Sequence, residues 1–186
     1  VKSGDADLGL LSYPTATNSV AVIPWREEKM SIVISPDHPL ASDHEVSLND
    51  LNGFDMVGFD QNLRIGQEIN RVLANANATP NVVMEFDNIE TLKRAIEINA
   101  GFSILPQAHV QREVSAGTLT AVTVNDNSLV RPVGIIHRDN IKLGKNTENF
   151  IELLIEDVQA PSAMHATPQT LQTNTEVRSG FVPSAK

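Results

Sequence analysis

Apolar and polar positions along the chain follow two different periods, and segments of one period alternate with segments of the other. Short runs rich in β-branched and aromatic residues have the pattern of strands. They cover residues 8–11, 31–35, 56–59, 82–86, 102–105, 119–124 and 132–137. Three longer segments, residues 64–77, 89–99 and 145–158, repeat apolar residues at helical spacing. Strands separated by helices of this length predict an α/β protein with parallel or mixed sheets and helices on their faces.

The helical stripes also predict which side chains are buried. In the first helix the stripe consists of Ile65, Ile69, Val72, Leu73 and Ala76. In the second, Leu92, Ala95 and Ile96 are expected in the core, whereas Lys93, Arg94 and Glu97 are expected to face water.

Capping residues predict the ends of the second helix. Asp87 or Asn88 is the expected N-cap, Glu90 lies where a capping box places an acid, and Gly101 is the expected left-handed stop. Free N–H groups at such strand-to-helix junctions collect ligands in open α/β sheets. The junctions "VGFDQNLRIGQ" and "MEFDNIET" are therefore where a ligand is expected.

The segment "SPDHPLASDHEVSLNDLNG" is rich in turn residues and predicts a structured surface loop. Ser47 is expected to cap a short helical turn, with Asp50 completing a capping box and Gly53 ending the turn. His38 is interpreted as a turn residue.

Composition narrows the classes of function. The apolar fraction of 41% is sufficient for a core, and the apolar runs are too short to predict a membrane span. The net charge of -9, with Lys and Arg scattered, argues against nucleic-acid binding by this chain. The absence of cysteine fits a reducing compartment, so we expect a soluble, cytoplasmic protein.

The sequence gives little support for a catalytic site. "GFS" lacks the second glycine of a nucleophile elbow, since Leu105 stands there, and the five histidines have no metal-ligand spacing. "GKNT" lacks the upstream glycine of a phosphate loop and is better explained as a helix start, while Arg131 and Arg138 are interpreted as solvated residues beside a strand. No enzyme activity, metal or cofactor is expected.

The two ends of the chain carry further expectations. The opening "VKSGDADLGLL" reaches a strand without a preceding unit, which predicts a fragment that begins inside a domain. Residues 159–186 are rich in Ser, Thr, Pro and Ala, a composition typical of disordered tails.

Four motifs occur in an order that resembles a known family. "SIVISPDHPLA", "SLNDLNGFDMVGF", "VVMEFDNIETLKRAIEINAGFSILP" and "VRPVGIIHR", followed by an amphipathic helix, resemble the effector-binding domain of LysR-type transcriptional regulators, in the branch of the CysB-like and CbbR-like proteins. The resemblance covers about residues 1–158. It implies a fold like the type 2 periplasmic binding proteins: two α/β subdomains joined by two crossover strands, with a small effector in the cleft between them.

The resemblance also implies boundaries, partners and site residues. Residues 1–24 and 132–158 would form an incomplete first subdomain, and residues 25–131 the second. A homodimer or tetramer is implied, with DNA and RNA polymerase contacted only through the full-length protein. The implied effector contacts are Asp60, Gln61, Asn62, Leu63 and Arg64, then Asn88 and Ile89, and Ser103. Arg64 favours an anionic effector, whereas Asp60 opposes one.

A second function remains open at this point. A solute-binding protein of a transporter would share the fold. The motifs "SPDHPLA" and "MEFDNIETLKRA" favour the regulator.

Overall fold

The structure is a computed structural model that describes residues 1–126, 128–139 and 141–159. Its strands are β1 (Leu8–Ser12), β2 (Val20–Ile34), β3 (Glu45–Val46), β4 (Asp55–Phe59), β5 (Asn81–Phe86), β6 (Ser103–Pro106), β7 (Thr120–Val124) and β8 (Val130–Arg138). Its helices are α1 (Arg64–Asn75), α2 (Ile89–Glu97), α3 (Gln111–Ala116) and α4 (Lys145–Gln159), with short 3-10 turns η1 (Pro39–Ser42), η2 (Leu48–Leu51) and η3 (Gln107–His109). The tail expected to be disordered falls, apart from Gln159, outside the described residues.

The strands form a mixed arrangement, as the alternating pattern predicts. The larger sheet has the order β1-β8-β2-β7-β3, and β6 pairs with the end of β2 on the edge opposite β7. Most of its pairs are antiparallel, while β3 with β7 and the separate pair β4 with β5 are parallel. The predicted α/β class is therefore confirmed.

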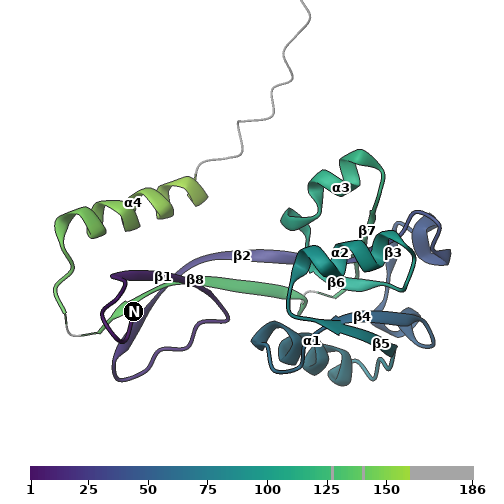
Figure 1. The fold of residues 1–186 in the computed structure, drawn as a ribbon, viewed down its shortest axis with the longest axis horizontal. Coiled ribbons are helices and arrows are strands. Elements are labelled where there is room, and N and C mark those ends of the chain that lie inside the picture. The colour runs from purple at the N-terminus through teal and green to yellow at the C-terminus, as the bar shows by residue number, and fades with distance from the viewer. Residues whose placement is uncertain (127, 140, 160–186) are drawn as a thin grey trace, which may run out of the picture.

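Two long strands, β2 and β8, run side by side through the molecule (Figure 1). They pair antiparallel from Val20 opposite Arg138 to Lys29 opposite Val130, with one shift of register between Pro24 and Arg26. At one end lie β1 and α4, and at the other α1, α2, α3 and the remaining strands (Figure 1). The main buried core, which includes Ile34, Leu92 and Phe102, belongs to this second group.

The sequence pattern predicted only the last part of β2. Its first part, "VAVIPWREEK", contains Pro24 and a run of charged residues, which removes the apolar alternation of a strand. Pairing with β8, distant in sequence, nevertheless holds this part extended. Pro24 is tolerated there because it lies at the register shift.

The helix caps are partly as predicted. Asn88 is the N-cap of α2, and its side chain accepts hydrogen bonds from the backbone N–H groups of Glu90 and Thr91. Glu90 is then one position too early for a capping box, and the prediction that placed it there was wrong. The left-handed residue after the helix is Asn99, with φ 58°, instead of Gly101. Gly101, with φ 148°, is needed because an added Cβ would lie 2.4 Å from the Asp55 carbonyl oxygen.

Lys93 was predicted to face water and is instead buried. Its Nζ lies 2.8 Å from carboxylate oxygens of both Glu90 and Glu113, so α2 is tied to α3 through one ammonium group. Burial alone would lower the pKa of Lys93, but the bonds to Glu113 and Glu90 raise it overall. The helical pattern missed this because α3 was not predicted.

The loop after β2 confirms the predicted turn chemistry. The Ser47 backbone N–H donates to the Asp50 carboxylate over 2.7 Å, and Gly53 follows with φ 82°. His38 is more than a turn residue: it is buried, and its Nδ1 accepts a hydrogen bond of 3.2 Å from the Leu40 backbone N–H at the start of η1.

Candidate functional site

A cleft of about 520 Å³ lies where the end of β1 faces the first turns of α1 and α2. Ser12 lines it from β1, Leu63 and Arg64 from the start of α1, and Asn88 and Ile89 from the start of α2. Arg131 and His109 line it from β8 and η3. Elements from both ends of the long β2–β8 pair thus contribute to one cleft (Figure 1).

The N-terminus of α1 opens at this cleft without a side-chain cap. Leu63 is the N-cap residue and has no side-chain acceptor for the free N–H groups of the first turn. Gly66 allows the turn to approach the end of β4, because a Cβ there would lie 2.5 Å from the Asp60 carbonyl oxygen. An uncapped helix N-terminus carries a partial positive charge that favours an anion.

The start of α2 is different, because its cap is already filled by Asn88. The side-chain oxygen of Asn88 is 2.8 Å from the Glu90 nitrogen. Its amide nitrogen forms no hydrogen bond with the described residues. It can therefore donate into the cleft while the oxygen caps the helix.

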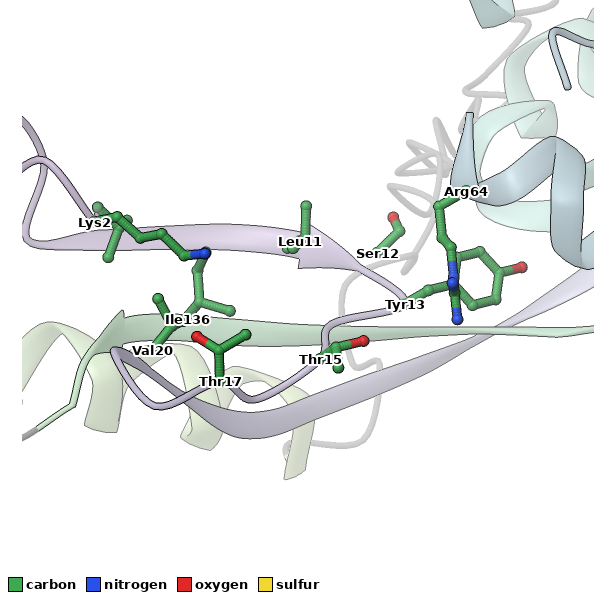
Figure 2. A pocket seen from close by; sticks show the side chains of 10 residues that line it. Lys2, Leu11, Ser12, Tyr13, Thr15, Thr17, Val20, Arg64 and Ile136 are labelled. Atoms are coloured by element: carbon green, nitrogen blue, oxygen red, sulfur yellow. The ribbon is translucent and has the colours of Figure 1, made fainter. Parts of the chain in front are cut away.

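Arg64 borders the cleft and a second cavity of about 450 Å³. Figure 2 shows its side chain extending from the start of α1 toward Tyr13, which follows β1. The Arg64 side chain is 58% exposed, and its guanidinium lies 3.0 Å from the Glu68 carboxylate. Tyr13 has φ 50°, an uncommon conformation for a residue with a Cβ, and its backbone N–H donates to the Pro132 carbonyl. Burial, followed by the charge of Glu68, raises the pKa of the Tyr13 phenol.

A cluster that the sequence reasoning missed lies at the β2–β8 side of the cleft. Arg131 was interpreted as a solvated residue, yet its side chain is only 15% exposed, and its Nε donates to the Glu28 carboxylate over 2.8 Å. Arg131 Nη2 also lies 2.9 Å from His109 Nε2. Burial alone would raise the pKa of Glu28, but its bond to Arg131 and the charges of Arg131 and Arg26 lower it overall. The sequence signal that could have found it is the charged run "REEK", residues 26–29, which lies inside the long strand β2.

Burial lowers the pKa of His109, and the neighbouring Arg131 charge lowers it further. The imidazole is therefore favoured in its neutral form, with Nε2 able to accept from the guanidinium. The Arg131 side chain is held in one orientation by a carboxylate and an imidazole.

The structure brings four of the predicted site residues together in the cleft: Leu63, Arg64, Asn88 and Ile89. Asp60, Gln61 and Asn62 form the turn before α1, where the Asp60 carboxylate accepts from the Asn62 backbone N–H over 2.8 Å, and they do not line the cleft. Ser103 is buried in β6, away from the cleft lining, and its Oγ has no hydrogen-bond partner among the described residues.

The part of the chain that the structure describes holds no group of three or more His, Asp or Glu residues able to bind a metal ion. Within the same residues, no helix combines the length and the apolar character that crossing a membrane requires. The cleft offers hydrogen-bond donors and charge, which suit reversible binding of a small molecule.

The chain is similar to known regulators. The family described as "LysR substrate binding domain" matches residues 1–159. The regulator CysL of Bacillus subtilis is 26% identical over 160 residues, covering 86% of this chain and 54% of that protein. A probable RuBisCO transcriptional regulator of Trichormus variabilis is 21% identical over 167 residues, covering 87% and 50%. The chain thus spans about half the length of the curated relatives it matches.

Solved structures show the same fold. The regulatory domain of CcmR from Synechocystis PCC6803, in complex with 2-PG, has a TM-score of 0.75 at 19% identity, with 83% of this chain and 74% of that chain covered. The effector-binding domain of QuiR, in complex with shikimate, has a TM-score of 0.75 at 16% identity, with 85% and 74% covered. These matches favour the regulator over the transporter protein and place the chain among transcription regulators, not enzymes. The chain belongs to the LysR substrate-binding domain family and is the effector-binding regulatory part of a LysR-type transcriptional regulator, with the type 2 periplasmic-binding-protein fold.

Proposed function

We propose that this chain senses a small anionic metabolite in the cleft between β1 and the first turns of α1 and α2. The observation that carries the proposal is the uncapped N-terminus of α1, which opens into a cleft of about 520 Å³ beside Arg64 and Asn88. Helix N–H groups, a guanidinium and an amide together suit a carboxylate or a phosphate. The 2-PG and shikimate in the structures of CcmR and QuiR support the choice of a small molecule.

The proposed contacts are Leu63, Arg64, Asn88 and Ile89, which line the cleft. Asp60, Gln61 and Asn62 would act by shaping the turn that leads into α1. Ser103 stays a prediction, since its buried side chain would need a rearrangement of β6 to reach a ligand.

The sensing step would be a change of angle between two subdomains, residues 1–24 with 132–158 and residues 25–131. The register shift between Pro24 and Arg26 in β2 supports a hinge at this boundary, because a broken ladder bends more easily than a regular one. A ligand shifts such an equilibrium only by its difference in affinity for the two states.

The test is a thermal-shift screen of the 186-residue chain against carboxylic acids, sugar phosphates and nucleotides. A ligand of the native state raises the melting temperature by mass action. Arg64→Ala should remove most of that shift. Arg71→Ala is the matched control, because Arg71 lies on the same helix and pairs with the same Glu68 but does not line the cleft. Equal shifts in both variants would reject Arg64 as a contact, and an effector that is uncharged would reject the anionic class.

The proposal extends to a homodimer formed through β5. This strand is one of only two in its sheet, and Val82, Val83 and Met84 on it are each more than 40% exposed. An exposed apolar edge strand is suited to pairing with another chain. Val83→Lys should shift sedimentation toward the monomer, whereas Val114→Lys, which replaces an equally exposed valine on α3, should not. A wild-type chain that stays monomeric at high concentration would contradict this interface.

In the full-length protein, we propose that the effector-dependent change is passed to a separate DNA-binding part and through it to RNA polymerase, in the cytoplasm. This chain matches only 54% of CysL, which is named as a helix-turn-helix regulator, and this supports a DNA-binding part separate from the effector-binding part.

A further inference from the structure

The buried cluster around Glu28 includes the guanidinium of Arg131, and one of its nitrogens, Nη1, is not needed for the ion pair with Glu28. We propose that Arg131 is a specificity-determining residue of the cleft, which binds the anionic group of the effector through its Nη1, while Glu28 acts as the positioning residue that aims it. This inference rests on the proposed function, because it assigns a second anchor in the same cleft.

The hydrogen bonds of Arg131 leave one side of its guanidinium unused. Nε donates to the Glu28 carboxylate over 2.8 Å, and Nη2 is shared between Glu28 and His109. Nη1 forms no hydrogen bond with the described residues, although the side chain is only 15% exposed and lines the cleft. A mostly buried arginine that lines a cavity and keeps an unpaired Nη1 is matched by an acceptor with negative charge.

The charges around Arg131 do not cancel. The Glu28 carboxylate serves two guanidinium groups, since Arg26 Nη2 lies 2.6 Å from its other oxygen. His109 adds no negative charge, and the nearby Lys93 ammonium is matched by the carboxylates of Glu90 and Glu113. Arg131 and Arg26 thus share the single carboxylate of Glu28, so these three residues carry one excess positive charge, which an anion in the cleft would offset.

The position of Arg131 would couple binding to the proposed hinge. Arg131 is on β8 and Glu28 is directly opposite it on β2, so the pair belongs to the two long strands. Leu63 and Arg64 on α1 belong, like Arg131, to residues 25–131, whereas Ser12 on β1 lines the same cleft from residues 1–24. An anion held by Arg131 and by the α1 N-terminus would favour the closed state through an additional contact with Ser12, which comes from the other proposed subdomain.

Replacing Arg131 by lysine separates this role from a purely structural one. Lysine keeps a positive charge for Glu28 but has a single ammonium group, so it cannot serve Glu28 and a ligand with a planar fork. Arg138→Lys is the matched control, because it makes the same change near the end of the same strand, outside the cleft.

The experiment measures the affinity of the 186-residue chain for inorganic phosphate and for acetate by calorimetry, with sodium chloride keeping the ionic strength equal. We expect Arg131→Lys to weaken binding about tenfold or more, which corresponds to about 1.4 kcal/mol, and Arg138→Lys to leave it unchanged. If Arg131→Lys binds only phosphate more weakly, the result supports the inference and indicates a phosphate ligand. If it binds acetate more weakly, the result supports the inference and indicates a carboxylate ligand.

Other outcomes overturn it. Unchanged binding by Arg131→Lys, with binding lost in Arg64→Ala, rejects Arg131 as an anchor and leaves the proposed function standing. No anion binding by the wild-type chain rejects this inference and the anionic effector together. If Arg131→Lys fails to fold, NMR of the arginine side chains in the wild-type chain decides: the Arg131 resonance must shift during the phosphate titration, and an unshifted resonance overturns the inference.

Discussion

Glu28 and Arg131 stand directly opposite each other on β2 and β8, and their side chains form an ion pair at the side of the cleft. The two residues are 103 positions apart in the sequence, so this pair joins distant parts of the chain. Both side chains are mostly buried, which makes each dependent on the other for its charge.

Removal of the Glu28 side chain should therefore lower the stability of the folded protein. Glu28→Ala leaves the Arg131 guanidinium without its carboxylate, and we expect a loss of about 3 kcal/mol in the free energy of unfolding. Glu27→Ala, which removes an exposed neighbour on the same strand, should change it by less than about 0.5 kcal/mol. Urea unfolding followed by circular dichroism measures both. Similar losses in the two variants would show that the pair does not stabilise the fold.

Acidification should destabilise the protein before its carboxylates titrate. Burial lowers the pKa of both His38 and His109 from the usual 6.5, with the Arg131, Arg26 and Lys93 charges adding to the effect at His109 against that of Glu28. The unfolded chain then binds more protons, so stability is complete above about pH 6.5 and falls as the pH decreases below it. The lowered pKa of Glu28 keeps its own contribution in place until more acidic pH.

The measurement is urea unfolding at about pH 7.5 and about pH 5.5. His38→Asn should reduce the difference between the two, because asparagine can still cap η1 through its side-chain oxygen and does not titrate. His44→Asn, at an exposed position, is the control. A wild-type stability that rises on acidification would contradict the assignment of neutral histidines.

The N-cap of α2 should stabilise the folded protein through its hydrogen bonds. Asn88→Ala removes the acceptor of the Glu90 and Thr91 N–H groups, and we expect about 1 kcal/mol of destabilisation. Asn88→Asp keeps the acceptor and should retain stability, but it removes the amide donor and adds a negative charge, so it should weaken binding of an anionic effector. Thermal unfolding with and without the screened ligand separates the two effects.

Replacing Gly66 by alanine should destabilise the protein, although alanine is normally the more stable residue in a helix. Gly→Ala in a helix interior normally adds about 1 kcal/mol of stability. Here the new Cβ would lie 2.5 Å from the Asp60 carbonyl oxygen, so we expect Gly66→Ala to destabilise by about 1–3 kcal/mol. Ala74→Gly, at an exposed position of the same helix, gives the reference cost of glycine in α1. A stabilising Gly66→Ala would contradict the close packing of α1 against the end of β4.

Trp25, the single tryptophan, should report how α4 packs. Its indole Nε1 donates to the Leu154 carbonyl oxygen over 2.7 Å, which joins α4 to β2. Ile151→Asp places a charge at a buried position of α4, and we expect the helix to detach and the Trp25 emission to shift to longer wavelength. Leu153→Asp, at a position that is 62% exposed, should leave the emission unchanged. The same spectrum from both variants would mean that α4 contributes little to the Trp25 environment.

Local patterns were sufficient for the elements whose stabilisation is local. The apolar stripe of α1, the Asn88 cap of α2 and the Ser47–Asp50 capping box depend on residues at most four positions apart, and each is present in the structure. The junctions at the starts of α1 and α2 were also identified as the ligand site, and both line the cleft. The family and fold followed from four motifs in order.

The sequence by itself determined the α/β class, the helices α1, α2 and α4 and the two junctions, because spacing and capping act within a few residues of the chain. Only the tertiary structure decided the full length of β2, the burial of Lys93 and the Glu28–Arg131–His109 cluster. A charged residue in a polar run looks solvated until a partner of opposite charge arrives from a distant strand or helix. That partner is supplied by strand register and helix packing, neither of which a local pattern encodes.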